Sequence, residues 1–392
     1  MLIKVNSSNM RVEATLSVKR KKIAFISHTS IFGGAERALL EIVEGLSKRD
    51  FDCTVFLPST GPLETELKSR GFSCYILKYS WWSNPNRKFR RNINSILAVY
   101  RFSVIFLRQR FDVVYTNTMM IPSGALAAKI CNIPHIWHIH EFGSDDHGLT
   151  LDIGNNFGRS LIGYLSSRVL CVSNAVRSKF TGIIPDGKLS TVYGAVNIPH
   201  ERSYRGPPAP SCDVRCVLVG VLRPSKGQKE AVEAISLLLK DGFSVKLSLV
   251  GAGPSENELR LLIRNLEIDE HVELVGHVDN PFKYVDQADI VLMCSKCEAF
   301  ARPVLEGMMM GKPIVGTRSG GTIEAVRDGF NGLLYTPGDA RDLADKIKIL
   351  GSDLTLARQF GANGRAWSRQ EFTMDRLLDR ISESIDAVLD KR

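Results

Sequence analysis

The chain has 392 residues, of which 44% are hydrophobic and 24% are charged, as in a globular protein long enough for two domains. Its net charge of +9 suits an anionic ligand, a nucleic acid or an anionic membrane, and no apolar run reaches the ~18 residues that span a bilayer. Residues 1–20 lack the apolar centre of a secretory signal and are predicted to be a loose leader. The scattered cysteines fit free thiols, so we expect a cytoplasmic protein.

From Lys22 onward, strand and helix patterns alternate. This alternation predicts a parallel, doubly wound sheet. The expected strands are 23–26, 53–57, 73–77 and 113–115, and the expected helices are 36–48 and 63–70. Gly33 and Gly34 lie between the first strand and the first helix. Backbone N–H groups can approach a phosphate or a sugar there, although a glycine pair serves equally well as a plain turn.

A basic segment with two tryptophans follows the third expected strand. It begins at Trp81 and Trp82, and its basic residues are Arg87, Lys88, Arg90 and Arg91. This composition is typical of an interfacial helix on an anionic membrane, and equally of a core helix with a solvated basic face. No recognised nucleic-acid-binding module surrounds the segment, so no nucleic-acid partner is predicted.

Residues 133–141 form a histidine-rich strand with His138 and His140 on one face. A metal site with residues 145–147 is disfavoured, because so short a strand cannot aim all the ligands inward. We expect His140 to be a hydrogen-bonding active-site residue, with a structural histidine as the alternative. Cys294 and Cys297 have the spacing of a zinc or redox pair but lack a matching second pair, so no metal is predicted.

A proline-rich linker is predicted at residues 199–211, between domains at 21–198 and 212–372. Lys226, at a loop-to-helix start in the second domain, is a natural phosphate ligand, although a lone lysine is more often a surface residue. Residues 251–256 resemble a dinucleotide fingerprint, but Glu256 occupies the third glycine position. An NAD-dependent oxidoreductase is therefore not predicted.

Two glutamates flank the start of a helix after the apolar strand 288–293. Glu298 lies on the loop, Pro303 opens the helix and Glu306 lies in it, before a Gly-Lys-Pro ending at 311–313. Ligands bind beyond the carboxyl ends of strands in such sheets, so the two carboxylates can hold the hydroxyls of a sugar or a ribose. Taken alone, the pattern favours two solvated glutamates, and only the rest of the chain reverses that preference.

These motifs in this order resemble the family 4 retaining glycosyltransferases, from about Lys22 to the C-terminus. The motifs are Gly33-Gly34, His140-Glu141, Lys226-Gly227, Glu298 with Glu306, Gly311-Lys312-Pro313, Gly320-Gly321 with Glu324, and Asp328-Gly329-Phe330-Asn331-Gly332. The resemblance implies the α/β fold called GT-B, in which two Rossmann-like doubly wound domains face each other across a cleft. It also implies that the last helix, about 373–392, returns to the N-terminal domain.

The activity implied by the resemblance is metal-independent transfer of a hexose, with retention, from a UDP- or GDP-linked sugar. The acceptor would be a lipid-linked molecule or a polysaccharide in cell-surface glycan synthesis, and the nucleotide sugar would be a substrate, with no cofactor. The basic segment would then touch an anionic membrane at its inner face.

The resemblance also assigns roles to individual residues. His140, Glu298 and Lys226 would be catalytic, with Lys226 neutralising the diphosphate and Gly33 and Gly34 near the diphosphate and acceptor. The remaining donor-binding residues would be Glu306 at the ribose, Arg223, His277 at the base, Phe300, Ala301, Arg302, Gly320 and Gly321.

The chain departs from the family at three places. Val221 stands where an arginine is common, Ala301 replaces a glycine, and residues 194–197 read Gly-Ala-Val-Asn in place of Asn-Gly-Val-Asp. Arg223 is a candidate to supply the missing charge. The alternative function is a non-catalytic nucleotide-sugar-binding or scaffold protein of a polysaccharide assembly complex. Val221 and Ala301 favour that alternative, and the retained charged residues oppose it.

Overall fold

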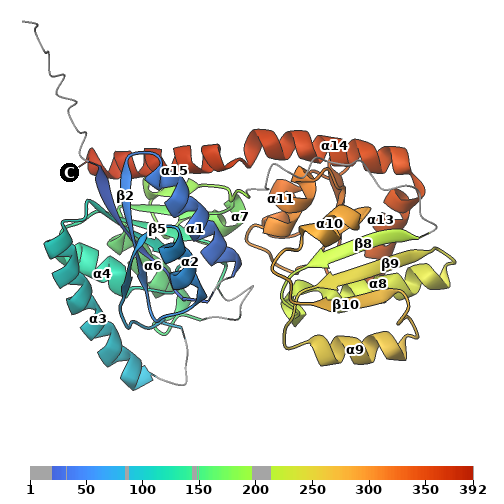
Figure 1. The fold of residues 1–392 in the computed structure, drawn as a ribbon, viewed down its shortest axis with the longest axis horizontal. Helices are drawn as coiled ribbons and strands as arrows, with labels where there is room; N and C mark the ends of the chain where they lie inside the picture. Colours follow the sequence, from blue (N-terminus) through green and yellow to red (C-terminus); the bar gives the residue numbers. More distant parts are fainter. Residues whose placement is uncertain are drawn as a thin grey trace, which may run out of the picture.

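A computed structural model describes residues 20–31, 33–83, 88–143, 148, 150–196 and 213–391. It has two lobes, each built on one sheet with helices packed against it (Figure 1). The N-terminal sheet has the strand order β3-β2-β1-β4-β5-β6-β7, and the C-terminal sheet has the order β10-β9-β8-β11-β12-β13. All these neighbouring strands pair in parallel, which confirms the predicted doubly wound architecture.

The N-terminal lobe alternates strands and helices along the chain. Its strands are β1 (Lys21–Ile26), β2 (Phe51–Leu57), β3 (Ser73–Ile76), β4 (Val113–Asn117), β5 (His135–Ile139), β6 (Arg168–Cys171) and β7 (Leu189–Thr191). Its helices are α1 (Gly34–Ser47), α2 (Pro62–Ser69), α3 (Lys88–Gln109), α4 (Ser123–Ile130), α6 (Asn155–Leu165) and α7 (Asn174–Ser178), with a 3-10 turn at Asp186–Lys188. Helix α1 buries one apolar stripe against the sheet, as its spacing predicts.

The C-terminal lobe repeats the pattern. Its strands are β8 (Val214–Val219), β9 (Val245–Val250), β10 (Val272–Gly276), β11 (Ile290–Met293), β12 (Ile314–Thr317) and β13 (Gly332–Tyr335). Its helices are α8 (Gln228–Lys240), α9 (Glu256–Asn265), α10 (Phe282–Gln287), α11 (Arg302–Met309), α12 (Thr322–Ala325), α13 (Ala340–Ser352) and α14 (Leu354–Glu371), with a 3-10 turn at Pro224–Lys226. Strand β13 was not among the elements expected from the sequence.

The last two helices connect the lobes. Helix α14 lies along the C-terminal lobe and α15 (Met374–Leu389) lies along the N-terminal lobe, both drawn in red (Figure 1). Leu378 packs so closely on α1 that a Cβ at Gly45 would lie 2.3 Å from its Cδ1. Leu378 also shares a buried core with β1 and α1. Helix α15 therefore contributes to the hydrophobic core of the N-terminal lobe.

The winding direction of each sheet reverses at its centre, between β1 and β4 and between β8 and β11. Ligands of open α/β sheets bind beyond the carboxyl ends of the strands at such reversals. In both lobes the loops leaving these strands line the space between the lobes. None of the described helices combines the length and apolar character that a membrane crossing needs.

Candidate active site

A cavity of about 470 Å³ lies between the lobes. The N-terminal lobe lines it with residues that follow β1, β4 and β5, and the C-terminal lobe lines it with residues that follow β8 and β11. The residues predicted for the site that line it are Gly34, His140, Arg223, Lys226, Glu298, Phe300 and Arg302. The fold thus gathers groups that are up to 268 residues apart in the sequence, from Gly34 to Arg302 (302 − 34).

Lys226 and Glu298 form an ion pair in this cavity. Lys226 Nζ donates to Glu298 Oε2 at 2.6 Å, and the two side chains are 23% and 16% exposed. Burial alone would raise the pKa of Glu298, but the Lys226 ammonium and a hydrogen bond from Ser295 hold it below its usual range. Glu298 is therefore an ionised carboxylate at neutral pH, and its partner is the cation predicted to meet a diphosphate.

The positive charge next to Lys226 comes from Arg223. Both residues line the cavity, as does Val221, whose side chain is 53% exposed. Arg223 therefore lies in the same wall as the position where the resemblance places an arginine. Ala301 is 2% exposed and belongs to the buried core around α11, so its methyl group packs into the lobe. Ala301 does not line the cavity, so the alanine in this glycine position gives the scaffold alternative no structural support.

His140 lies at the end of β5 in the N-terminal wall. Its ring is 4.0 Å from that of His138, measured between centroids, and Tyr115 Oη lies 2.6 Å from His138 Nδ1. Burial lowers the pKa of His140 to about 3, with further lowering from the charges of His28 and Arg302. His140 is therefore a neutral imidazole at neutral pH, which can form hydrogen bonds but carries no positive charge.

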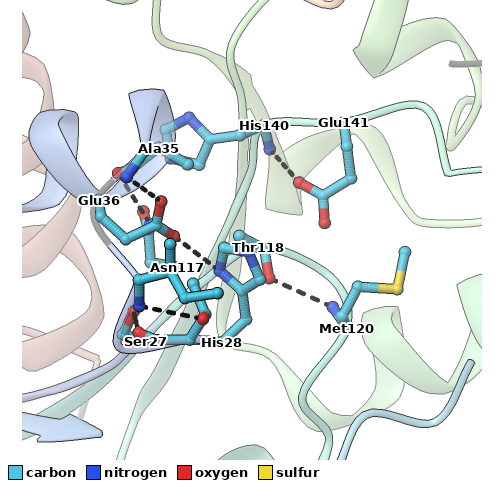
Figure 2. A network of polar contacts seen from close by, with 12 residues as sticks. Ser27, His28, Ala35, Glu36, Asn117, Thr118, Met120, His140 and Glu141 are labelled. Atoms are coloured by element: carbon cyan, nitrogen blue, oxygen red, sulfur yellow. Dashed lines mark hydrogen bonds and ion pairs between the residues drawn. The ribbon is translucent and has the colours of Figure 1, made fainter. Parts of the chain in front are cut away.

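Glu36, which was not predicted from the sequence, also lines the cavity. Figure 2 shows its carboxylate among the polar contacts at the start of α1. Its Oε2 accepts from Gly33 N at 3.2 Å in a capping box, and its Oε1 lies 3.1 Å from His28 Nδ1. Burial raises the pKa of Glu36 to about 7. The available signal was the glutamate at the third position of a helix that begins at the second glycine of a pair.

Arg302 joins the two lobes. Its guanidinium donates to Glu41 of α1 at 2.9 and 3.1 Å and to Ala195 O at 3.2 Å. Glu306, one turn along α11 from Arg302, is 5% exposed, and burial raises its pKa against the opposing charges of Arg302 and Arg37. The structure thus places the Arg302 side chain in an interlobe ion pair, a role that the sequence did not predict.

A second interlobe contact comes from Glu324 of α12. Its two carboxylate oxygens accept from Asn174 N at 2.8 Å and Ala175 N at 2.7 Å, at the start of α7. Tyr193 Oη donates to the same carboxylate at 2.9 Å. One carboxylate of the C-terminal lobe thus satisfies three donors of the N-terminal lobe.

The glycine pair 320–321 supports the Glu298 loop. Gly321 N donates to Glu298 O at 2.7 Å, and a Cβ at Gly321 would lie 2.0 Å from Ala299 O. Gly320 has a φ of +53°, and its Cβ would lie 2.5 Å from Glu298 O. Glycine is required at both positions because backbone meets backbone there. His277, by contrast, is 78% exposed at the end of β10.

The structure corrects the prediction that the two tryptophans contact a membrane. Trp82 is 8% exposed, and its Nε1 donates to Met119 O at 2.8 Å. The Trp81 Nε1 donates to His28 O at 2.7 Å, and Trp81 lines the cavity between the lobes. Arg87 lies outside the described residues, as do the side chains of Lys88, Arg90 and Arg91.

The described part of the chain holds no group of three or more histidine, cysteine, aspartate or glutamate side chains placed to bind a metal. Residues 145–147, which the metal hypothesis included, lie outside the described residues.

Two family models match the chain in succession. "Glycosyltransferase Family 4" matches residues 32–199, and "Glycosyl transferases group 1" matches residues 207–367. An uncharacterised glycosyltransferase of Methanocaldococcus jannaschii is 26% identical over 295 residues, which are 73% of this chain and 79% of that protein. The capsular polysaccharide biosynthesis glycosyltransferase CapM of Staphylococcus aureus is 24% identical over 44% of this chain and 45% of its own length.

Solved structures share the fold. Anabaena HepE in complex with UDP superimposes with a TM-score of 0.77 at 23% identity, over 93% of this chain and 100% of that one. The two matched models and this superposition cover both lobes in chain order. The chain therefore belongs to the glycosyltransferases with a family 4 domain followed by a group 1 domain, and it has their GT-B fold.

Proposed function

We propose that this glycosyltransferase moves a hexose, with retention and without a metal, from a UDP- or GDP-linked sugar to a lipid-linked or polysaccharide acceptor in cell-surface glycan synthesis. The observation that carries the proposal is the interlobe cavity, where Lys226, Glu298 and Arg223 face a wall containing His140. The printed names of CapM and of HepE in complex with UDP support a polysaccharide context and a uridine nucleotide.

The proposed sugar transfer requires the protein to stabilise the diphosphate as it leaves. The bond from the anomeric carbon to the diphosphate oxygen breaks, and the diphosphate leaves with the electron pair. The acceptor oxygen bonds to that carbon on the same face, and its proton passes to the departing diphosphate. Lys226 and Arg223 supply positive charge where the negative charge develops, and the positive end of the α11 dipole lies at the same cavity.

The other cavity residues position the sugar. Glu298, kept ionised by Lys226, accepts hydrogen bonds from donor-sugar hydroxyls, and the neutral His140 hydrogen-bonds the transferred sugar from the opposite lobe. In this proposal Glu306 binds the ribose, and the backbone near His277 meets the base. Closure of the lobes excludes water, which would otherwise compete with the acceptor.

The proposal extends to location, at the cytoplasmic face of an anionic membrane. Helix α3 presents Ile96, Tyr100 and Leu107 to solvent, with 71%, 70% and 63% exposure, and its first turn is basic. A variant that neutralises Arg87, Lys88, Arg90 and Arg91 should lose binding to anionic liposomes. Equal binding by this variant and the wild type would contradict the membrane part of the proposal.

Thermal shift tests the donor site directly. UDP, GDP, ADP, dTDP and their sugar conjugates are added without metal to the wild type, Lys226→Ala and Glu306→Ala. One nucleotide should raise the Tm of the wild type and neither variant should respond, whereas the control Lys240→Ala, at the far end of α8, should respond fully. A wild type that responds to no nucleotide at millimolar concentration would contradict the transferase. Nucleotide-sugar binding without transfer or hydrolysis would favour the scaffold alternative.

A further inference from the structure

Three side chains of the N-terminal lobe form a continuous part of the cavity wall. Trp81, His28 and Glu36 all line the cavity. Trp81 Nε1 donates to His28 O at 2.7 Å, and the two rings lie 5.3 Å apart between centroids. His28 Nδ1 in turn lies 3.1 Å from Glu36 Oε1 (Figure 2). Each residue thus contacts the next, so the three form one continuous surface.

This wall offers two kinds of surface to a ligand. The only polar atom of the Trp81 indole is already bonded to His28 O, so the rest of the indole presents carbon. Beside it, Glu36 presents a carboxylate that is 4% exposed as a residue, and burial raises its pKa to about 7. A carboxylate has about four acceptor positions, and the two contacts of Glu36 leave capacity for a hydroxyl donor.

The charged side chains of the cavity differ between its two walls, and the proposed diphosphate site lies on the wall opposite Glu36. The cations Arg223 and Lys226 lie in the C-terminal wall, whereas the carboxylate of Glu36 lies in the N-terminal wall. A carboxylate repels a phosphate, so the Glu36 wall suits a neutral ligand with hydroxyl groups. A sugar ring has a C–H face that can lie on an indole and hydroxyls that can donate to a carboxylate.

We propose that Trp81, His28 and Glu36 form an acceptor subsite that binds the terminal sugar ring of a glycan, with Trp81 under the ring and Glu36 accepting a ring hydroxyl. This inference rests on the proposed function and specifies its acceptor as a sugar rather than a lipid phosphate. His28 is a positioning residue, since it holds both neighbours.

The competing explanation is that Glu36 only caps α1. Its Oε2 does accept from Gly33 N, as a capping box requires. Glutamine serves equally well at this position of a capping box, so Glu36→Gln keeps the cap and removes the charge. A purely structural role predicts no change in ligand binding from that substitution.

The experiment measures ligand binding by saturation-transfer NMR in the presence of UDP, or of the nucleotide that thermal shift identifies. The probes are the methyl glycosides of glucose, galactose, mannose and N-acetylglucosamine, with sorbitol as an open-chain polyol. The proteins are the wild type, Glu36→Gln, Trp81→Ala, Trp81→Phe and the control Glu44→Gln, whose carboxylate lies on the exposed side of α1 and is 36% exposed.

At least one glycoside should bind the wild type and the Glu44→Gln control equally, and sorbitol should not bind. Glu36→Gln and Trp81→Ala should weaken glycoside binding about tenfold or more, because each removes a buried contact of the bound ligand. Trp81→Phe should lose less affinity for the glycoside than Trp81→Ala, since phenylalanine keeps an aromatic surface.

Three results would overturn the subsite. The first is that no glycoside binds while the nucleotide does, and the second is that sorbitol binds as well as the glycosides. The third is that Glu36→Gln binds the glycoside like the wild type. Nucleotide binding is measured on the same samples and should stay unchanged in all four variants. A wild type that fails to bind any nucleotide would instead overturn the proposed function, so the two failures are distinguishable.

Discussion

Glu36→Gln should make the protein more stable at alkaline pH and leave its stability nearly unchanged in weak acid. Burial raises the pKa of Glu36 to about 7, which is about 2.5 above its usual value of 4.5. Each step of one in pKa corresponds to about 1.4 kcal/mol, so the ionised carboxylate costs the folded state about 3 kcal/mol. Glutamine has the same shape, keeps the capping box and never ionises.

The sign of the pH dependence follows from the raised pKa. The folded state holds the proton of Glu36 more tightly than the unfolded chain, so this contribution to stability is complete below pH 4.5. It is lost as the pH rises through about 7. The free energy of unfolding of Glu36→Gln, minus that of the wild type, should therefore increase by about 3 kcal/mol between pH 4.5 and pH 9.

Urea unfolding, monitored by tryptophan fluorescence, measures this difference in unfolding free energy in the lobe that contains Glu36. Trp81, Trp82 and Trp137 lie in the N-terminal lobe with Glu36, and the fourth tryptophan, Trp367, lies on α14. All other titratable groups are the same in Glu36→Gln and the wild type, so their contributions to the pH dependence cancel in the difference. A Glu36→Gln difference that stays flat from pH 5 to pH 9 would refute the reasoning.

Three further substitutions test the ion pair of the cavity and the two contacts between the lobes. Lys226→Met leaves Glu298 buried without its cation and should destabilise the protein by about 2–3 kcal/mol at pH 7 in urea unfolding. Because the pKa of Glu298 is lowered, that loss should shrink as the pH falls below 4.5. Arg302→Met should cost about 1–3 kcal/mol, and a double-mutant cycle with Glu41→Gln should show coupling between the two. Glu324→Ala should speed hydrogen exchange at the first amides of α7 about tenfold or more, measured by mass spectrometry against the unchanged amides of α9.

The fold could be predicted because its signals are local. Apolar runs of four to seven residues followed by amphipathic stretches mark strands and helices wherever they occur, and their alternation implies parallel sheets. The spacing within α1 and the Pro-then-helix start at Pro303 are of this kind. The cavity residues that were predicted came from the resemblance, because their motifs occur in the same order as in the family 4 glycosyltransferases.

The sequence could not show which charged groups meet across the cavity. Arg302 and Glu41 are 261 positions apart, and nothing in the residues around either one indicates the other. Glu36 was overlooked because a glutamate in the first turn of a helix is usually a solvated cap. The tryptophans at 81 and 82 were misjudged because a tryptophan beside basic residues has the same composition on a membrane and in a core.

The Glu298 loop is tied to both interlobe contacts. Arg302 begins the helix that follows this loop, and Glu324 follows the glycine pair whose Gly321 donates to Glu298 O. Arg302 of α11 bonds to Glu41 of α1, and Glu324 of α12 bonds to the start of α7, so the two helices that follow the loop are both bonded to the N-terminal lobe. A ligand that displaces Glu298 from Lys226 therefore acts on the same segment that holds the lobes together. We therefore expect the proposed donor binding to be coupled, through this loop, to the contacts that hold the lobes together.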